Sequence, residues 1–105
     1  MFAEQNKDLV DQAVENEYKK MCSTYGKTYH TKHEGYAVLK EEIEEAEDEL
    51  KIINDFFNRL WINVTKNEHF ICELNGIKER SKLLAQEAFQ VSAVCQKFLS
   101  GVEND

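Results

Sequence analysis

Proline is absent from all 105 residues of the chain, and only four residues are glycine. Long helices can therefore form without the residue that most strongly breaks them. Residues with high helix propensity dominate, and the strict alternation of apolar and polar residues that is typical of half-buried strands is missing. The sequence predicts an all-α fold.

The longest hydrophobic repeat of the chain follows a capping box. Thr31 and Glu34 have the T-x-x-E spacing that marks a helix N-terminus, so we expect a helix to begin after Thr31. The repeat then advances by three and four residues over about four heptads, as in helices that pack along a seam. Its members are Tyr36, Leu39, Ile43, Ala46, Leu50, Ile53, Phe57, Leu60 and Val64.

The length of this helix bears on the assembly. An unbroken helix from 32 to 64 is about 50 Å long, whereas a compact domain of this size has a radius of gyration of only about 13 Å. We therefore expect that the helix kinks or that another chain covers its overhang. The second alternative favours a homodimer or homotetramer.

Other helices are predicted on either side. A first helix covers about 3–22, and a loop follows at 23–31. The segment 65–76 is ambiguous, because Asn75 and Gly76 are possible interrupters. A second heptad helix then ends near Ser100 and Gly101, with its seam at Ile77, Ser81, Leu84, Ala88, Val91, Cys95, Phe98 and Val102. The chain is thus expected to form one domain, 1–105, an antiparallel helical bundle of three or four helices completed by oligomerisation.

Charge and composition narrow the possible partners. The net charge of -7 and the pI near 5.0 argue against nucleic acid and anionic membranes, which bind basic surfaces. Three cysteines without paired spacing argue against a zinc site. No apolar run has the length of a signal peptide or a membrane span, so we expect a reduced, cytoplasmic protein.

The acidic run within 33–50 divides by helical rotation. With Ile43 at the centre of the seam, Glu41 and Asp48 lie almost opposite it, as solvated residues do. One flank instead carries a stripe that is apolar at its ends and acidic in its middle. This stripe consists of Val38, Glu42, Glu45, Glu49 and Phe56.

A matching stripe on the last helix contains Leu83, Glu87, Gln90 and Val94. If the seams of the two helices meet, two pairs of oxygen-bearing side chains spaced i,i+3 can form a four-oxygen cage. Oxygen ligands select Mg²⁺ or Mn²⁺ over zinc. Acidic pairs of this spacing are also common on the solvated face of a Glu-rich helix, so both interpretations stay open at this point.

Two phrases of the sequence resemble a known family. HEGYAVLKEEIEEAEDEL at 33–50 and LLAQEAFQVSAVCQKFL at 83–99 are similar to segments of the all-α nucleoside triphosphate pyrophosphohydrolases, the MazG-like group, in particular its short phage and bacterial members. The family carries an EExxE motif, here Glu41 to Glu45, and an ExxD motif, here Glu87 to Gln90.

The resemblance implies an enzyme that hydrolyses a nucleoside triphosphate between its α and β phosphates and releases pyrophosphate. It also implies Mg²⁺, or Mn²⁺, held by Glu42, Glu45, Glu87 and the side chain at 90. Glu41 is then a candidate catalytic base. This chain departs from the family at Gln90, which replaces an aspartate, and in the 41 residues (46–86) between Glu45 and Glu87.

Three further residues are candidates for substrate binding. Glu49 continues the acidic stripe, Lys97 is one of the basic residues near the second motif, and His33 belongs to a loop cluster of aromatic residues and histidines that can contact a base or phosphate. The alternative is that the loop aromatics only cover the end of the bundle. The competing function is a non-catalytic helical interaction protein, which the two heptad seams and Gln90 favour.

Overall fold

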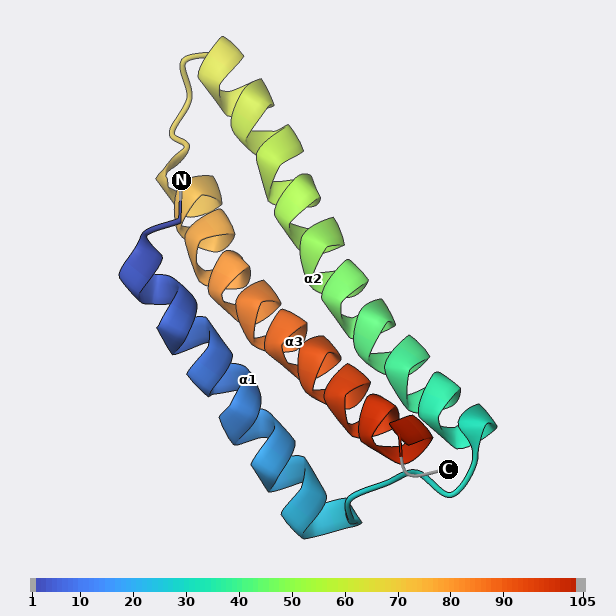
Figure 1. Ribbon diagram of the computed structural model, residues 1–105. Helices are drawn as coiled ribbons and strands as arrows, with labels where there is room; N and C mark the ends of the chain where they lie inside the picture. Colours follow the sequence, from blue (N-terminus) through green and yellow to red (C-terminus); the bar gives the residue numbers. More distant parts are fainter. Residues whose placement is uncertain (1, 104–105) are drawn as a thin grey trace.

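The computed structural model describes residues 2–103, and these form three helices joined by two short loops (Figure 1). The helices are α1 (Glu4–Tyr25), α2 (Lys32–Thr65) and α3 (Ile71–Glu103). The described part of the chain contains no strand, so the all-α prediction is confirmed. None of the three helices combines the length and apolar character needed to span a membrane.

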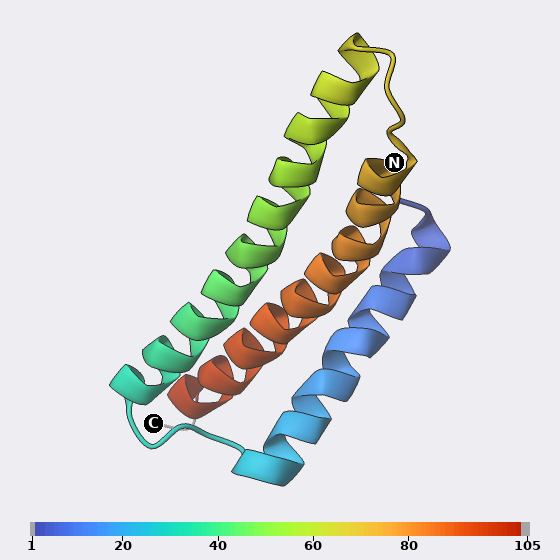
Figure 2. The same cartoon turned by 180° about the vertical axis from the view of Figure 1, so that it is seen from behind.

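The three helices form one flat layer. Helix α3 lies in the middle and packs against both α1 and α2, while α1 and α2 make no contact with each other. Both views show α1 and α2 on opposite sides of α3 (Figures 1 and 2). The described residues measure 60 × 32 × 21 Å. The most buried side chains accordingly belong to the central helix, and they are Ala93, Val94 and Lys97.

Helix α2 begins and continues as the sequence predicts. The Thr31 hydroxyl accepts a hydrogen bond from the backbone N–H of Glu34 at 3.0 Å, and the helix runs for 34 residues without interruption. Its length is matched by the 33 residues of α3, which lies antiparallel to it (Figure 1). The radius of gyration is accordingly 17.7 Å. Thus α3 covers the expected overhang, and the helix length alone does not require a second chain.

Two glycines let aromatic rings approach the α2–α3 interface closely. A Cβ atom on Gly76 would lie 2.6 Å from the Phe56 ring, and one on Gly35 would lie 2.8 Å from the Phe98 ring. These contacts set the antiparallel register of the two helices. They also explain why α3 passes through Gly76, where an interruption was possible. The predicted end of α3 near Gly101 was too early, since the helix continues to Glu103.

Only part of the predicted heptad seam of α2 packs against α3. Leu39, Ala46, Ile53 and Leu60 are half-buried. The positions that repeat every seven residues are instead 40–66% exposed, namely Tyr36, Ile43, Leu50, Phe57 and Val64. The two seams therefore meet only in part, along a groove that Ala46 of α2 and Leu84 and Ala88 of α3 help to line. Helix α3 covers the acidic flank of α2 because Gly35 and Phe56 on that flank form the close contacts described above.

Candidate metal-binding site

Three carboxylates converge between α2 and α3. One oxygen each of Glu42, Glu45 and Glu87 lies within 4.8 Å of the other two. Glu42 and Glu45 lie one turn apart on α2, and Glu87 reaches them from α3 because the helices are antiparallel. The spacing predicted from rotation on α2 is thus realised, although α3 faces the acidic flank of α2 and only part of its seam.

Two oxygens of this cluster lack a protein partner. The Oε2 atoms of Glu42 and Glu87 are buried, and neither has a hydrogen-bond partner. Burial raises the pKa of Glu42 to about 7, with further contributions from the charges of Glu45, Glu87 and Glu41. Burial also raises the pKa of Glu87, and its interaction with Glu45 adds to the effect. The cluster therefore holds more negative charge than the protein itself compensates.

The cluster fits a hard divalent cation. Its donors are all carboxylate oxygens, which suit Mg²⁺ and Mn²⁺ better than zinc. A cation between the helices would give the two buried oxygens the partner that they lack, and it would reverse the repulsion between neighbouring carboxylates.

Gln90 lies one turn after Glu87 on α3 and is half-buried. Its amide oxygen can bind a cation as a neutral ligand. Glutamine is neutral, so Gln90 adds no negative charge to the three carboxylates of the cluster. We therefore expect a weaker interaction with a divalent cation than an aspartate would give.

Glu49, predicted as a substrate-binding residue, pairs with a cation of the protein. Its carboxylate accepts hydrogen bonds from Nη1 of Arg80, which lies 3.4 Å from each carboxylate oxygen. The Glu49 side chain is 18% exposed. This ion pair links α2 to α3 beside the three-carboxylate cluster. The sequence placed Glu49 on the acidic stripe of α2, but its pairing with Arg80 depends on the register of α2 against α3.

Glu41 is exposed and lies four residues before Glu45, so its carboxylate is at the outer edge of the cluster. A rotation of about 100° per residue, counted from Ile43 along the sequence, predicted that Glu41 points away from any partner helix. Glu41 is not one of the three converging carboxylates, but its charge contributes to the raised pKa of Glu42, its neighbour in the chain.

Lys97 is the only charged side chain among the buried residues of 2–103, at 2% exposure. Its Nζ atom lies 4.3 Å from the centre of the Tyr29 ring, which is the geometry of a cation–π contact. Tyr29 also packs edge-to-face on Phe98 at 6.0 Å, and burial raises its pKa, as do the charges of Glu34 and Glu42. The loop tyrosine thus covers the amine, an arrangement that sequence reasoning missed because no spacing rule links 29 to 97.

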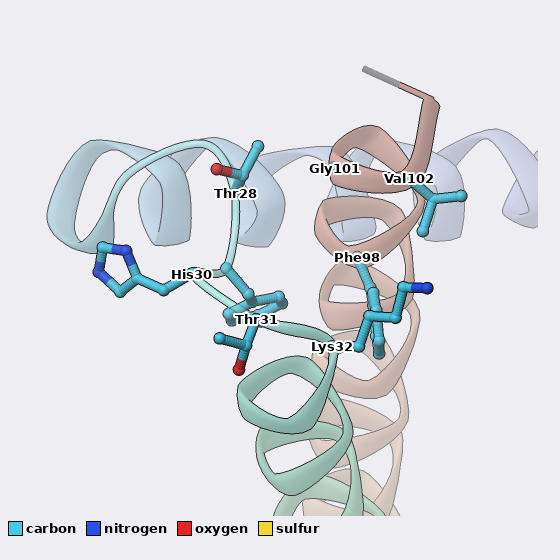
Figure 3. A pocket seen from close by; sticks show the side chains of 8 residues that line it. Thr28, His30, Thr31, Lys32, Phe98, Gly101 and Val102 are labelled. Carbon is cyan, nitrogen blue, oxygen red and sulfur yellow. The ribbon is translucent and has the colours of Figure 1, made fainter. Parts of the chain in front are cut away.

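The two loop histidines are not part of the cluster. His33, predicted as a substrate-binding residue, is exposed in the first turn of α2. His30 lies at a separate pocket of about 220 Å³, lined by residues 28–32 and by Phe98, Gly101 and Val102. The His30 side chain points away from α3 (Figure 3). This pocket occupies the end of the bundle, while the carboxylates lie several turns further along it.

Comparisons with known proteins add no relative. No protein-family description matches the chain, and neither a curated protein nor a solved structure matches it.

Proposed function

We propose that the protein is a Mg²⁺-dependent nucleotide pyrophosphohydrolase of the MazG-like type, which hydrolyses a nucleoside or deoxynucleoside triphosphate to the monophosphate and pyrophosphate. The observation that carries the proposal is the convergence of Glu42, Glu45 and Glu87 within 4.8 Å, with two buried oxygens that have no protein partner. The family phrases of the sequence supply the reaction. The proposed substrate is a free nucleotide and not a nucleic acid, because the net charge of -7 disfavours binding to a long polyanion. The proposed compartment is the cytoplasm.

Each residue of the candidate site has a separate role in this proposal. Glu42, Glu45 and Glu87 would hold the cation, Mg²⁺ or Mn²⁺, and Gln90 would complete the set with a neutral oxygen. When bound, the cation would supply the positive charge that the phosphates need. Glu41, at the outer edge of the cluster, accepts the proton of the attacking water. The bond between the α phosphorus and the bridging oxygen breaks, and pyrophosphate leaves with the electron pair.

Lys97 and His33 are proposed contacts of the triphosphate. The Lys97 amine has the charge that a phosphate needs, and movement of Tyr29 in the loop before α2 would expose it. His33 lies exposed at the start of α2, where the backbone N–H groups of the first turn also favour anions. Glu49 has a structural role in this proposal, since Arg80 neutralises it.

Cation binding can be tested separately from catalysis. We expect Mg²⁺ or Mn²⁺ to raise the melting temperature, because the cation binds the folded cluster only. Glu45→Gln should abolish this increase. Glu44→Gln is the matched control: it removes the same charge from an exposed position on the same helix, so the increase should persist. A melting temperature that is unaffected by millimolar Mg²⁺ and Mn²⁺ would contradict the proposed site.

Catalysis is tested by pyrophosphate release across all common ribo- and deoxyribonucleoside triphosphates with Mg²⁺. We expect turnover of at least one of them by the wild-type protein and by Glu44→Gln, and none by Glu42→Gln. Absence of release across the whole panel, at protein concentrations that bind Mg²⁺, would reject the enzymatic part of the proposal.

A second candidate function is a non-catalytic helical interaction protein. It is favoured by the exposed apolar positions of α2 and by the neutral Gln90. In this case Mg²⁺ leaves the melting temperature unchanged, and Glu42→Gln is stabilising because it removes an uncompensated buried charge. The measurements described above distinguish the two functions.

A further inference from the structure

The Lys97 amine is enclosed near one end of the bundle. Lys97 is 2% exposed, and its Nζ atom lies 4.3 Å from the centre of the Tyr29 ring. None of the ion pairs found among the described side chains involves Lys97. Burial of an ammonium without a negative partner is unfavourable. The face of the ring attracts a cation much less strongly than an anion does, so the amine is poised to exchange the ring for an anion.

The contacts that hold Tyr29 over the amine are weak. Tyr29 belongs to the loop between α1 and α2, and the residues beside it, 26–28 and 30–31, are exposed. Its hydroxyl donates to Sδ of Met21 at 3.9 Å, and sulfur is a weak acceptor. Its ring packs edge-to-face on Phe98 with the ring centres 6.0 Å apart. The covering side chain can therefore move without unfolding a helix.

A space lies beside the ring. The pocket of about 220 Å³ at the end of the bundle is lined by residues 28–32, which include Tyr29, and by Phe98, Gly101 and Val102 of α3. Figure 3 shows Thr28 on the loop across this pocket from Phe98 on α3. Because Tyr29 covers Lys97 and also lines the pocket, a change of its side-chain rotamer would move the ring from the amine into the pocket.

The covered amine is near the candidate metal site. Lys97 lies two turns after Gln90 on the same face of α3, about 10 Å further along the helix. Burial raises the pKa of Tyr29, as do the charges of Glu34 and Glu42. The ring is thus within electrostatic reach of Glu42, which belongs to the three-carboxylate cluster. A polyphosphate at the cluster would bring negative charge towards the covered amine.

We propose that Tyr29 is a lid, which closes over Lys97 in the free protein and swings into the neighbouring pocket when a polyphosphate reaches the amine. Phosphate oxygens then replace the ring as the partner of Lys97, because a charge-assisted hydrogen bond is stronger than a cation–π contact. The triphosphate as the anion rests on the proposed function, whereas the closed lid does not.

The lid is tested by reductive methylation of lysines, followed by mass spectrometry without any nucleotide. We expect slow methylation of Lys97 relative to the exposed Lys51. Tyr29→Ala should raise the rate at Lys97 by at least about tenfold, since a minor open state is populated at about 0.1–10%. Tyr25→Ala is the matched control, because it removes a ring that is 77% exposed beside the same loop. Equal rates in the wild type and Tyr29→Ala would overturn the proposal.

The direction of the movement is tested by filling the pocket. A Cβ atom on Gly101 would lie 3.6 Å from Thr28 across the pocket, so Gly101→Leu should occupy the space that the open ring needs. We expect slower methylation of Lys97 than in the wild type. If Tyr29→Ala loses its helical circular dichroism, Gly101→Leu decides: a slower rate supports the lid, and an unchanged or faster rate overturns it.

The response to the anion is tested with inorganic triphosphate and Mg²⁺. In the wild type, triphosphate should raise the nitration of Tyr29 by tetranitromethane, because the ring leaves its covered position. In Tyr29→Ala it should slow the methylation of Lys97. Lys97→Met should abolish the effect on nitration, and sodium chloride at the same ionic strength should have none.

No change in the nitration of Tyr29 with triphosphate, or an equal change with sodium chloride, would overturn the proposal. A nucleotide panel without pyrophosphate release would instead reject the proposed function alone, because neither labelling experiment measures turnover.

Discussion

The buried carboxylates of the candidate site favour different protonation states with and without a cation. Without one, burial and the neighbouring charges raise the pKa of Glu42 to about 7, so the folded chain retains a proton that the unfolded chain releases near pH 4.5. With a divalent cation, the ionised form is the one that binds. A single residue thus links folding, pH and cation binding.

The stability of the cation-free protein should depend on pH through this residue. A raised pKa in the folded state stabilises the protein fully below the unfolded value near 4.5, and that stabilisation is lost as the pH rises through about 7. We therefore expect the melting temperature in a chelating buffer to fall between pH 5 and about 7.5. Glu87, whose pKa is also raised, acts in the same direction.

Two variants test whether Glu42 causes this pH dependence. Glu42→Gln should flatten the profile, because glutamine does not titrate, while Glu44→Gln should leave it as in the wild type. Saturating Mg²⁺ should also flatten it, since the cation stabilises the ionised cluster. A profile that rises over this range in the chelating buffer would contradict the raised pKa.

Gln90 stands where the family proposed for this chain carries an aspartate, and replacing it with aspartate tests the effect of the missing charge on cation binding. Gln90→Asp adds a fourth carboxylate beside Glu87. We expect it to lower the Mg²⁺ concentration at half-saturation by about tenfold, which corresponds to about 1.4 kcal/mol of binding free energy. The rate of pyrophosphate release should rise. Without Mg²⁺ it should lower the melting temperature, since it adds uncompensated charge.

This expectation is wrong if Gln90→Asp and the wild type reach half-saturation at the same Mg²⁺ concentration. Gln86→Glu is a suitable control, because residue 86 is exposed one residue before Glu87. It adds the same charge to α3 outside the ligand set.

At the scale of the elements, periodicity and capping predicted most of what the structure contains. The all-α class, the start of α2 after Thr31 and the pairing of Glu42 with Glu45 follow from spacing along one helix. The face of α2 that meets α3 does not follow, because it depends on contacts between helices. Gly35 and Gly76 decide it by admitting the rings of Phe98 and Phe56, and a glycine within a helical pattern does not by itself indicate which partner approaches.

Gly76→Ala should destabilise the protein although alanine favours helices by about 0.5–1 kcal/mol. The added Cβ would lie 2.6 Å from the Phe56 ring, and such overpacking costs about 1–3 kcal/mol. Gly101→Ala is the matched control, because its Cβ would lie no closer than 3.6 Å to Thr28. Chemical denaturation should show a loss for the first variant and no loss for the second.

The contact with Phe56 can be separated from other effects of Gly76→Ala. Phe56→Leu shortens the side chain, so in that background we expect the cost of Gly76→Ala to become smaller. An equal cost in both backgrounds would show that the ring is not the cause.

At the scale of the whole molecule, the three helices contribute unequally to stability. Helices α2 and α3 share the longer interface. Helix α1 contacts α3 alone, and none of its 22 residues is fully buried. Its polar links to α3 are few among the described residues, with Gln96 donating to Glu15 at 3.1 Å and Tyr18 lying 3.4 Å from Ser100.

We therefore expect α1 to open before the rest of the fold. In native-state hydrogen exchange followed by mass spectrometry, amides of α1 should exchange faster than those in the middle of α2 and α3, because local opening requires less free energy where little apolar surface is buried. Equal protection of all three helices would contradict this order, since it would mean that the contacts of α1 with α3 resist opening as strongly as the α2–α3 interface.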